Sequence, residues 1–128
     1  MTLDETIKKI RARNDQEEAG QTDKDVAYFR QRGFREYDAQ ETAELCDARG
    51  IKRSYATILD DKLGGGAHLP HQIEELHDDF NQGVKDFSEA TGLEVTQAQA
   101  YRTLKEHGDE VVGKDAYDAA QTLLLQYH

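Results

Sequence analysis

The chain has 128 residues and a formal net charge of −10, with 33% charged and 37% hydrophobic residues. This length suits one compact domain, and the acidic balance argues against a protein that binds a polyanion with its whole surface. A single cysteine excludes an internal disulfide, and no apolar run approaches the roughly 18 residues that a membrane span needs. We therefore expect a soluble, cytoplasmic protein with no membrane partner.

The charge is unevenly distributed along the sequence. Residues 1–64 carry 12 Lys+Arg against 14 Asp+Glu, a net of −2, whereas residues 65–128 carry 4 against 12, a net of −8. A nucleic acid would be repelled by the second half and tolerated by the first.

Apolar residues recur at helical spacing from the first residues onward. A first helix is expected from about residue 3 to residue 18, opened by a Thr-x-x-Glu capping box. A short second helix begins at Thr22 and stops at Gly33, after which Phe34 can pack back on its end.

The next two helices are separated by another glycine. Asp38 and Glu41 form the expected cap of the third helix, which stops at Gly50. The fourth helix is expected from about residue 54 to residue 63. Its inward side chains are Tyr55, Ile58 and Leu59.

Helical spacing continues after a triple glycine. Pro70 suits the first turn of a fifth helix, and a separate sixth helix is expected at about 84–91. Thr96 caps the seventh, and the eighth covers about 114–127, with Tyr117, Ala120, Leu124 and Tyr127 inward. The predicted fold is all-α, a compact multi-helix domain over residues 1–128.

One turn pattern occurs twice, 42 residues apart. In each copy a helix ends at a glycine, an apolar residue follows, and a second helix begins: Gly50 precedes Ile51, and Gly92 precedes Leu93. Glycine permits the positive φ of a tight turn between helices. The copies predict helix-turn-helix-like units at about 39–63 and 84–107. The alternative is two ordinary helix pairs.

Basic and hydrogen-bonding side chains surround the first copy of this turn. A recognition helix carries its phosphate contacts and base-reading side chains at such positions. The candidate DNA-binding residues are Arg49, Lys52, Arg53, Ser54, Tyr55 and Thr57, with Arg30, Arg32 and Arg35 in a basic run before them. Glutamates surround the second copy. We therefore expect the second copy to support the first or to mediate pairing, and not to read DNA bases.

Three segments between residues 38 and 76 carry a resemblance to a known family. They read QETAEL at 40–45, GIKRSY at 50–55 and LPHQIEEL at 69–76. Together they resemble the helix-turn-helix core of ParB/KorB-type partition and repressor proteins. The resemblance implies double-stranded DNA as a partner, with residues 50–55 at the start of the recognition helix.

The sequence contains no catalytic constellation. His68, His71 and His77 lie near acidic residues, but their spacing matches no zinc or di-metal signature. The triple glycine lacks the Lys-Ser/Thr pair of a phosphate loop. Cys46 lies on an apolar helix face and is expected to be a small core residue. We expect no enzyme activity, no metal and no cofactor.

Two functional interpretations follow from these features. The first is a small helix-turn-helix protein that binds DNA or regulates transcription as a homo-oligomer. The alternative is an acidic helical interaction module without DNA affinity: a phage- or plasmid-type inhibitor, a DNA mimic, or a component of a virion or another complex. Its carboxylates would bind a host or complex protein. The candidate partner-binding residues are Glu74, Glu75, Asp78, Asp79 and Asp86.

Overall fold

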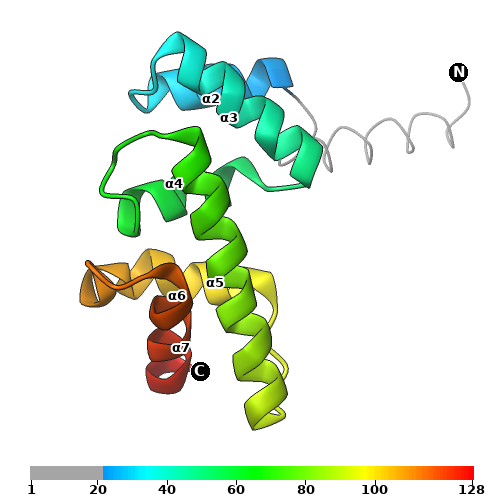
Figure 1. The fold of residues 1–128 in the computed structure, drawn as a ribbon, viewed down its shortest axis with the longest axis vertical. Helices are drawn as coiled ribbons and strands as arrows, with labels where there is room; N and C mark the ends of the chain where they lie inside the picture. The colour runs from blue at the N-terminus through cyan, green and yellow to red at the C-terminus, as the bar shows by residue number, and fades with distance from the viewer. Residues whose placement is uncertain (1–21) are drawn as a thin grey trace, which may run out of the picture. The chain divides into compact units, whose positions relative to one another are not determined.

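A computed structural model describes residues 22–128, and the regular secondary structure in this part of the chain is helical, with no strand (Figure 1). The elements are α2 (Thr22–Gln31), α3 (Glu36–Arg49), α4 (Arg53–Lys62), α5 (Pro70–Thr91), α6 (Gln97–His107), the 3-10 helix η1 (Gly108–Val111) and α7 (Ala116–Tyr127). The predicted all-α fold is confirmed for these residues. The helix predicted over residues 3–18 lies outside them. In the described range no helix is both long and apolar enough to cross a membrane.

The chain divides into two compact units, an N-terminal unit (Met1–Ser54) and a C-terminal unit (Tyr55–His128). The helix-turn-helix unit predicted at 39–63 therefore begins in one unit and ends in the other. The prediction of a single domain over the whole chain stays a prediction.

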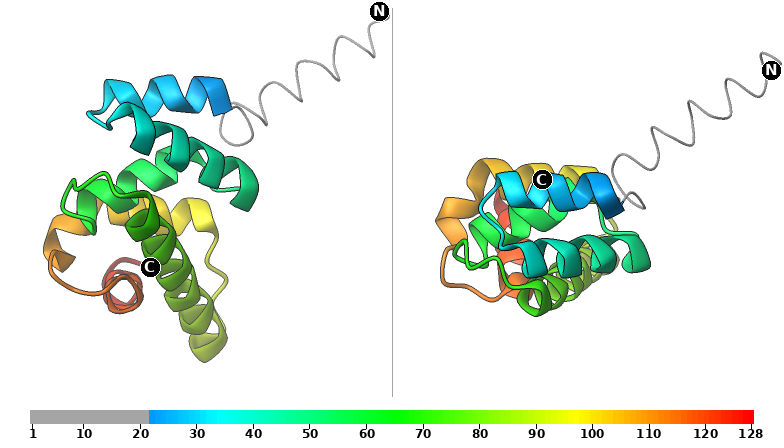
Figure 2. Two further views of the ribbon diagram at one scale, coloured as in Figure 1. Left: turned by 45° about the horizontal axis from the view of Figure 1, so that its top comes forward. Right: turned by 90° about the horizontal axis from the view of Figure 1, so that it is seen from above.

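In the N-terminal unit α2 lies beside α3, as both views of Figure 2 show. The turn between them is built as the sequence predicts. Gly33 adopts a φ of 97°, and the Phe34 amide donates to the carbonyl of Phe29 over 3.2 Å. Both phenyl rings are buried, with 5.0 Å between their centroids. The glycine and the aromatic contact together end α2.

Helix α3 begins earlier than expected. It starts at Glu36, after Arg35, so Asp38 lies inside the first turn and the predicted Asp38 cap is wrong. The acidic side chains remain favourable there because they face the positive end of the helix dipole. The predicted stop is confirmed, since Gly50 has a φ of 64° and its amide donates to the Cys46 carbonyl. Cys46 is buried, as predicted.

In the C-terminal unit α5 is one continuous helix of 22 residues, so the separate helix predicted at 84–91 is wrong. Gly83 lies within it without breaking it. A Cβ at this glycine would lie 2.7 Å from the Tyr117 carbonyl oxygen and 2.9 Å from the Ala120 Cβ. The glycine therefore lets α7 pack closely along the second half of α5 (Figure 1).

The core of the C-terminal unit gathers side chains from α4, α5, α6 and α7. Tyr101 lies at its centre and stacks on Tyr55, with ring centroids 4.1 Å apart and planes inclined by 6°. The predicted Thr96 cap of α6 is confirmed, and Gln99 completes a capping box. The buried members of this core are Leu59, Phe80, Val84, Phe87, Ala100, Tyr101, Leu104, Val111, Ala116, Ala119, Ala120, Leu123 and Leu124.

Helix α7 buries only part of the face that the sequence predicts. Ala120 and Leu124 are buried as expected, but Tyr117 is half-buried and Tyr127 is exposed. Two polar contacts account for the difference, since the Tyr117 hydroxyl donates to Asp86 and the Tyr127 hydroxyl to Glu110. A tyrosine keeps its ring against the core edge while its hydroxyl bonds at the surface.

Candidate functional site

Arg53, a predicted phosphate contact, pairs with a buried carboxylate in the N-terminal unit. Its Nη1 lies 3.0 Å from Oδ1 of Asp25, whose side chain is fully buried, while the Arg53 side chain keeps 22% of its exposure. Burial raises the pKa of the Asp25 carboxyl, and the Arg53 guanidinium opposes that rise. Because the charge of Arg53 already stabilises a buried anion, a phosphate would have to compete for it.

The other oxygen of that carboxylate has no hydrogen-bond partner. Within residues 22–128, Asp25 Oδ2 is one of the few buried side-chain atoms without a partner. Sequence reasoning missed this aspartate. The available signal was its position four residues before Phe29, which places a carboxylate on the inward face of α2.

Three side chains of α4 have partners within the C-terminal unit. Tyr55 stacks on Tyr101, and Lys62 Nζ lies 3.1 Å from Asp109 Oδ1. Asp60 is buried and accepts bonds from the backbone amide and from Nδ1 of His68, at 2.9 Å and 2.6 Å. A helix held in this way offers few side chains to a DNA groove.

The remaining α4 candidates are also poorly placed for base reading. Ser54 and Thr57 are half-buried, and Asp61 is the exposed residue of this helix. A carboxylate at that position would repel phosphate oxygens. Helix α4 therefore lacks an exposed polar face on which the predicted base-reading side chains could contact DNA.

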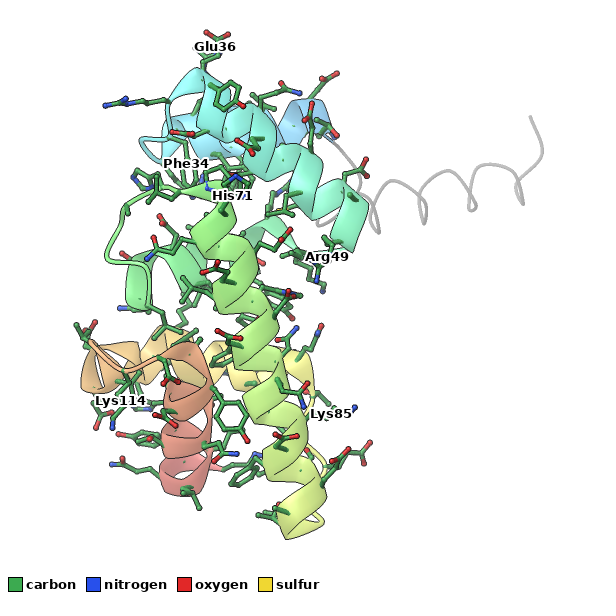
Figure 3. The ribbon with its side chains drawn as sticks, viewed as in Figure 1. Phe34, Glu36, Arg49, His71, Lys85 and Lys114 are labelled. Atoms are coloured by element: carbon green, nitrogen blue, oxygen red, sulfur yellow. The ribbon has the colours of Figure 1, made fainter. Side chains whose placement is uncertain are left out.

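Five candidate basic residues are exposed, and they form two groups. Arg30, Arg32 and Arg35 lie at the end of α2 and in the turn after it, while Arg49 ends α3 and Lys52 precedes α4. Figure 3 shows Arg49 at the end of α3. Helix α3 has 14 residues, so these groups lie at ends of a helix about 20 Å long.

Tyr28 lies between two of the candidate arginines. The Arg32 guanidinium carbon is 3.4 Å from the Tyr28 ring centroid, and that of Arg53 is 5.3 Å from it. Arg32 also donates to the Tyr28 carbonyl over 3.0 Å. These cation–π contacts stiffen the arginines and leave their charge in place.

Over residues 22–54 seven basic side chains balance seven acidic ones.

The candidate partner-binding carboxylates lie on α5. Glu75, Asp78 and Asp79 are exposed, and Glu74 is half-buried. At 100° per residue the exposed three face away from the buried stripe of α5. The C-terminal unit as a whole carries five Lys+Arg against fourteen Asp+Glu, a net of −9.

Asp78 and Asp86 of this set have side-chain partners: Asp78 lies 3.2 Å from Nδ1 of His77, and Asp86 is held by two hydrogen bonds. Asp86 accepts from the Tyr117 hydroxyl at 2.6 Å and from Gln82 at 2.9 Å. These hydrogen bonds, with that from Tyr117 the stronger influence, lower the pKa of the Asp86 carboxyl. Asp86 therefore links α5 to α7 and is less available to a partner.

No metal or nucleophile site emerges in the described part of the chain. No group of three or more His, Cys, Asp or Glu residues in it could hold a metal ion. Burial raises the pKa of the Cys46 thiol to about 12, so the thiol stays protonated and unreactive near neutral pH.

No protein-family model matches the chain, and comparison with curated proteins and with solved structures finds no significant match. The resemblance to ParB/KorB-type proteins therefore stays a hypothesis. Function is inferred from the side chains and charges described above.

Proposed function

We propose that this protein is an acidic helical module that binds a basic surface of a partner protein through α5. The observation that carries this proposal is the outward row of exposed carboxylates on that helix, within a unit of net charge −9. Helix α5 has 22 residues and is about 33 Å long, enough to present such a row to a groove.

Glu75 and Asp79 suit recognition because their carboxylates are exposed to solvent. Glu75 and Asp79 are four residues apart and lie one above the other on the helix. Exposed charges of one sign chiefly accelerate encounter with an opposite charge, and salt screens them beyond about 8 Å at physiological ionic strength. Salt-dependent association is therefore the expected signature of this surface.

The contacts of α4 favour this function over reading of DNA by a recognition helix. Arg53 balances a buried carboxylate and Tyr55 stacks in the core, so two of the predicted DNA contacts already have structural roles. Substituting Arg53 or Tyr55 would therefore lower stability, and this loss would obscure any effect on DNA binding.

A charge-neutralised pair of variants tests the proposal. Glu75→Gln/Asp79→Asn removes two carboxylates from α5, while Glu94→Gln/Asp118→Asn removes two exposed carboxylates elsewhere in the same unit. A synthetic arginine-rich peptide serves as the basic probe in stopped-flow association. We expect the α5 variant to associate about threefold to tenfold more slowly at low salt, the control to change far less, and the difference to vanish at high salt. Equal slowing in both variants would contradict a specific α5 surface.

A second candidate function is DNA binding through the exposed arginines of the α2–α3 turn. We propose it because Arg30, Arg32 and Arg35 are exposed together at one end of the N-terminal unit, which is not acidic overall over residues 22–54. In a mobility-shift titration with mixed duplex DNA, Arg30→Ala and Arg35→Ala should each lower the salt slope by about 1. Lys114→Ala, an exposed lysine on the C-terminal unit (Figure 3), is the control. No shift by the parent protein would exclude this candidate.

A further inference from the structure

A depression of about 290 Å³ lies on the C-terminal unit between α5 and the start of α6. Four of its lining residues come from α5, and two come from the segment that opens α6. They are Asn81, Val84, Lys85, Ser88, Val95 and Gln97.

The lining of this depression contrasts with the charge of the unit around it. Fourteen carboxylates and five basic side chains belong to residues 55–128, yet the lining contains a lysine and no carboxylate. All four polar lining side chains can donate a hydrogen bond, and two valines provide an apolar wall. Hydrogen-bond donors and a positive charge that line one depression beside an apolar wall suit a carboxylate on a small apolar body.

Three of these donors are not used within the fold. Among residues 22–128, no ion pair involves Lys85, and no side-chain hydrogen bond involves Ser88 or Gln97. Figure 3 shows Lys85 projecting outward from the second half of α5. The neighbouring Asp86 directs its carboxylate to Tyr117 and Gln82. Lys85 acts on the Asp86 carboxylate through its charge but forms no ion pair with it, so the ammonium can still pair with a ligand.

The fourth donor, Asn81, is held in a fixed orientation by its neighbours. Its Oδ1 accepts from the buried Tyr101 hydroxyl at 2.9 Å, and its Nδ2 donates to Nε2 of His77 at 3.0 Å. One amide hydrogen of Nδ2 remains after these two bonds. A donor already oriented by the core loses little conformational entropy when it binds a ligand.

We propose that this depression binds a carboxylate carried on a short apolar body. The Lys85 ammonium pairs with the carboxylate, the Ser88 and Asn81 side chains donate to its oxygens, and Val84 and Val95 contact the apolar part. The volume lies just below the range of about 300–1,000 Å³ for drug-sized ligands, so the ligand is a small one. A free branched-chain acid and the last residue of a polypeptide share this chemistry.

Chemical-shift titration of the full chain tests the site. Sodium isovalerate is the first probe, and isovaleramide, which keeps the shape and lacks the charge, is its control. We expect isovalerate to shift the amide signals of Ser88, Val95 and Gln97 with millimolar affinity, and isovaleramide to bind at least about fivefold more weakly. Lys85→Gln should weaken isovalerate by a similar factor, whereas Lys105→Gln, an exposed lysine on α6, should not.

A second arm distinguishes the two sources of the carboxylate. An acetylated dipeptide that ends in valine is compared with its amidated form. Tighter binding of the free-carboxylate peptide than of isovalerate assigns the site to a chain end, and the reverse assigns it to a free small acid. Three results would overturn the proposal: no shift by either probe up to about 50 mM, equal binding of isovaleramide, or equal effects of Lys85→Gln and Lys105→Gln. Ser88→Leu, with unchanged circular dichroism, should abolish the shifts by filling the depression.

Discussion

Removing the guanidinium of Arg53 should destabilise the N-terminal unit by leaving a buried carboxylate without its counter-charge. Asp25 is fully buried, and its ion-pair partner among the described residues is Arg53, whose Nη1 lies 3.0 Å from Oδ1. Breaking one side of a buried pair costs about 3–5 kcal/mol. Arg53 keeps 22% of its side-chain exposure, so we expect Arg53→Ala to cost about 2–3 kcal/mol, which is below that range because solvent screens part of the interaction.

The loss should depend on pH in a direction set by Asp25. Burial raises the folded-state pKa of this carboxyl above its ordinary value of 3.8, so the folded state holds the proton more tightly than the unfolded state does. Stability therefore falls as the pH rises from 3.8 through the folded-state pKa. Without Arg53 that pKa rises further, which extends the fall to higher pH. The difference between parent and variant should be small near pH 4 and largest near neutral pH.

Urea denaturation between pH 4 and pH 7.5, followed by circular dichroism, measures this difference. Arg30→Ala, an exposed arginine on α2, is the control and should change stability by no more than about 0.5 kcal/mol. Asp25→Asn/Arg53→Ala should lose the pH dependence that the single variant gains. A pH-independent cost for Arg53→Ala, or a cost no larger than that of Arg30→Ala, would refute the role assigned to this pair.

Three further substitutions test the C-terminal unit by urea denaturation. Gly83→Ala should cost about 1–3 kcal/mol because its Cβ would lie 2.7 Å from the Tyr117 carbonyl oxygen of α7, and an unchanged midpoint would contradict this close packing. Thr96→Ala should cost about 1 kcal/mol by removing the capping box of α6, and an unchanged midpoint would contradict it. Tyr117→Phe removes a hydrogen bond that lowers the folded-state pKa of the Asp86 carboxyl. The stability that this hydrogen bond contributes above pH 3.8 should therefore be lost in the variant. That difference should disappear as the pH falls below the folded-state pKa, and a constant difference would contradict it.

Local backbone rules explain which parts of the fold were predictable. Gly33, Gly50 and Gly92 all adopt positive φ where the sequence places helix ends, and Pro70 and Thr96 open helices as expected. Each of these signals acts within a few residues, so it survives in any tertiary context. The continuity of α5 was missed because Gly83 packs closely against α7, a contact between residues distant in sequence.

The candidate sites were less predictable because their contacts join distant residues. Arg53 begins a helix in the sequence, but its pairing with Asp25 crosses 28 positions. Tyr55 stacks on a residue in α6, and the depression combines α5 with the segment after it. Composition did indicate the acidic surface, because solvated carboxylates need no specific partner to remain exposed.

The two copies of the turn share their backbone conformation and differ in what surrounds them. Gly50 and Gly92 have φ values of 64° and 72°, and each amide donates to the carbonyl four residues earlier. Ile51 is buried after the first turn, whereas Leu93 is 47% exposed after the second. Ala56 is fully buried, and its counterpart Ala98 is exposed. The repeated pattern therefore specifies a helix stop and not a repeated packing unit. Because the packing differs, the two halves need not share a function, and their charges, balanced over 22–54 and strongly negative over 55–128, favour distinct partners.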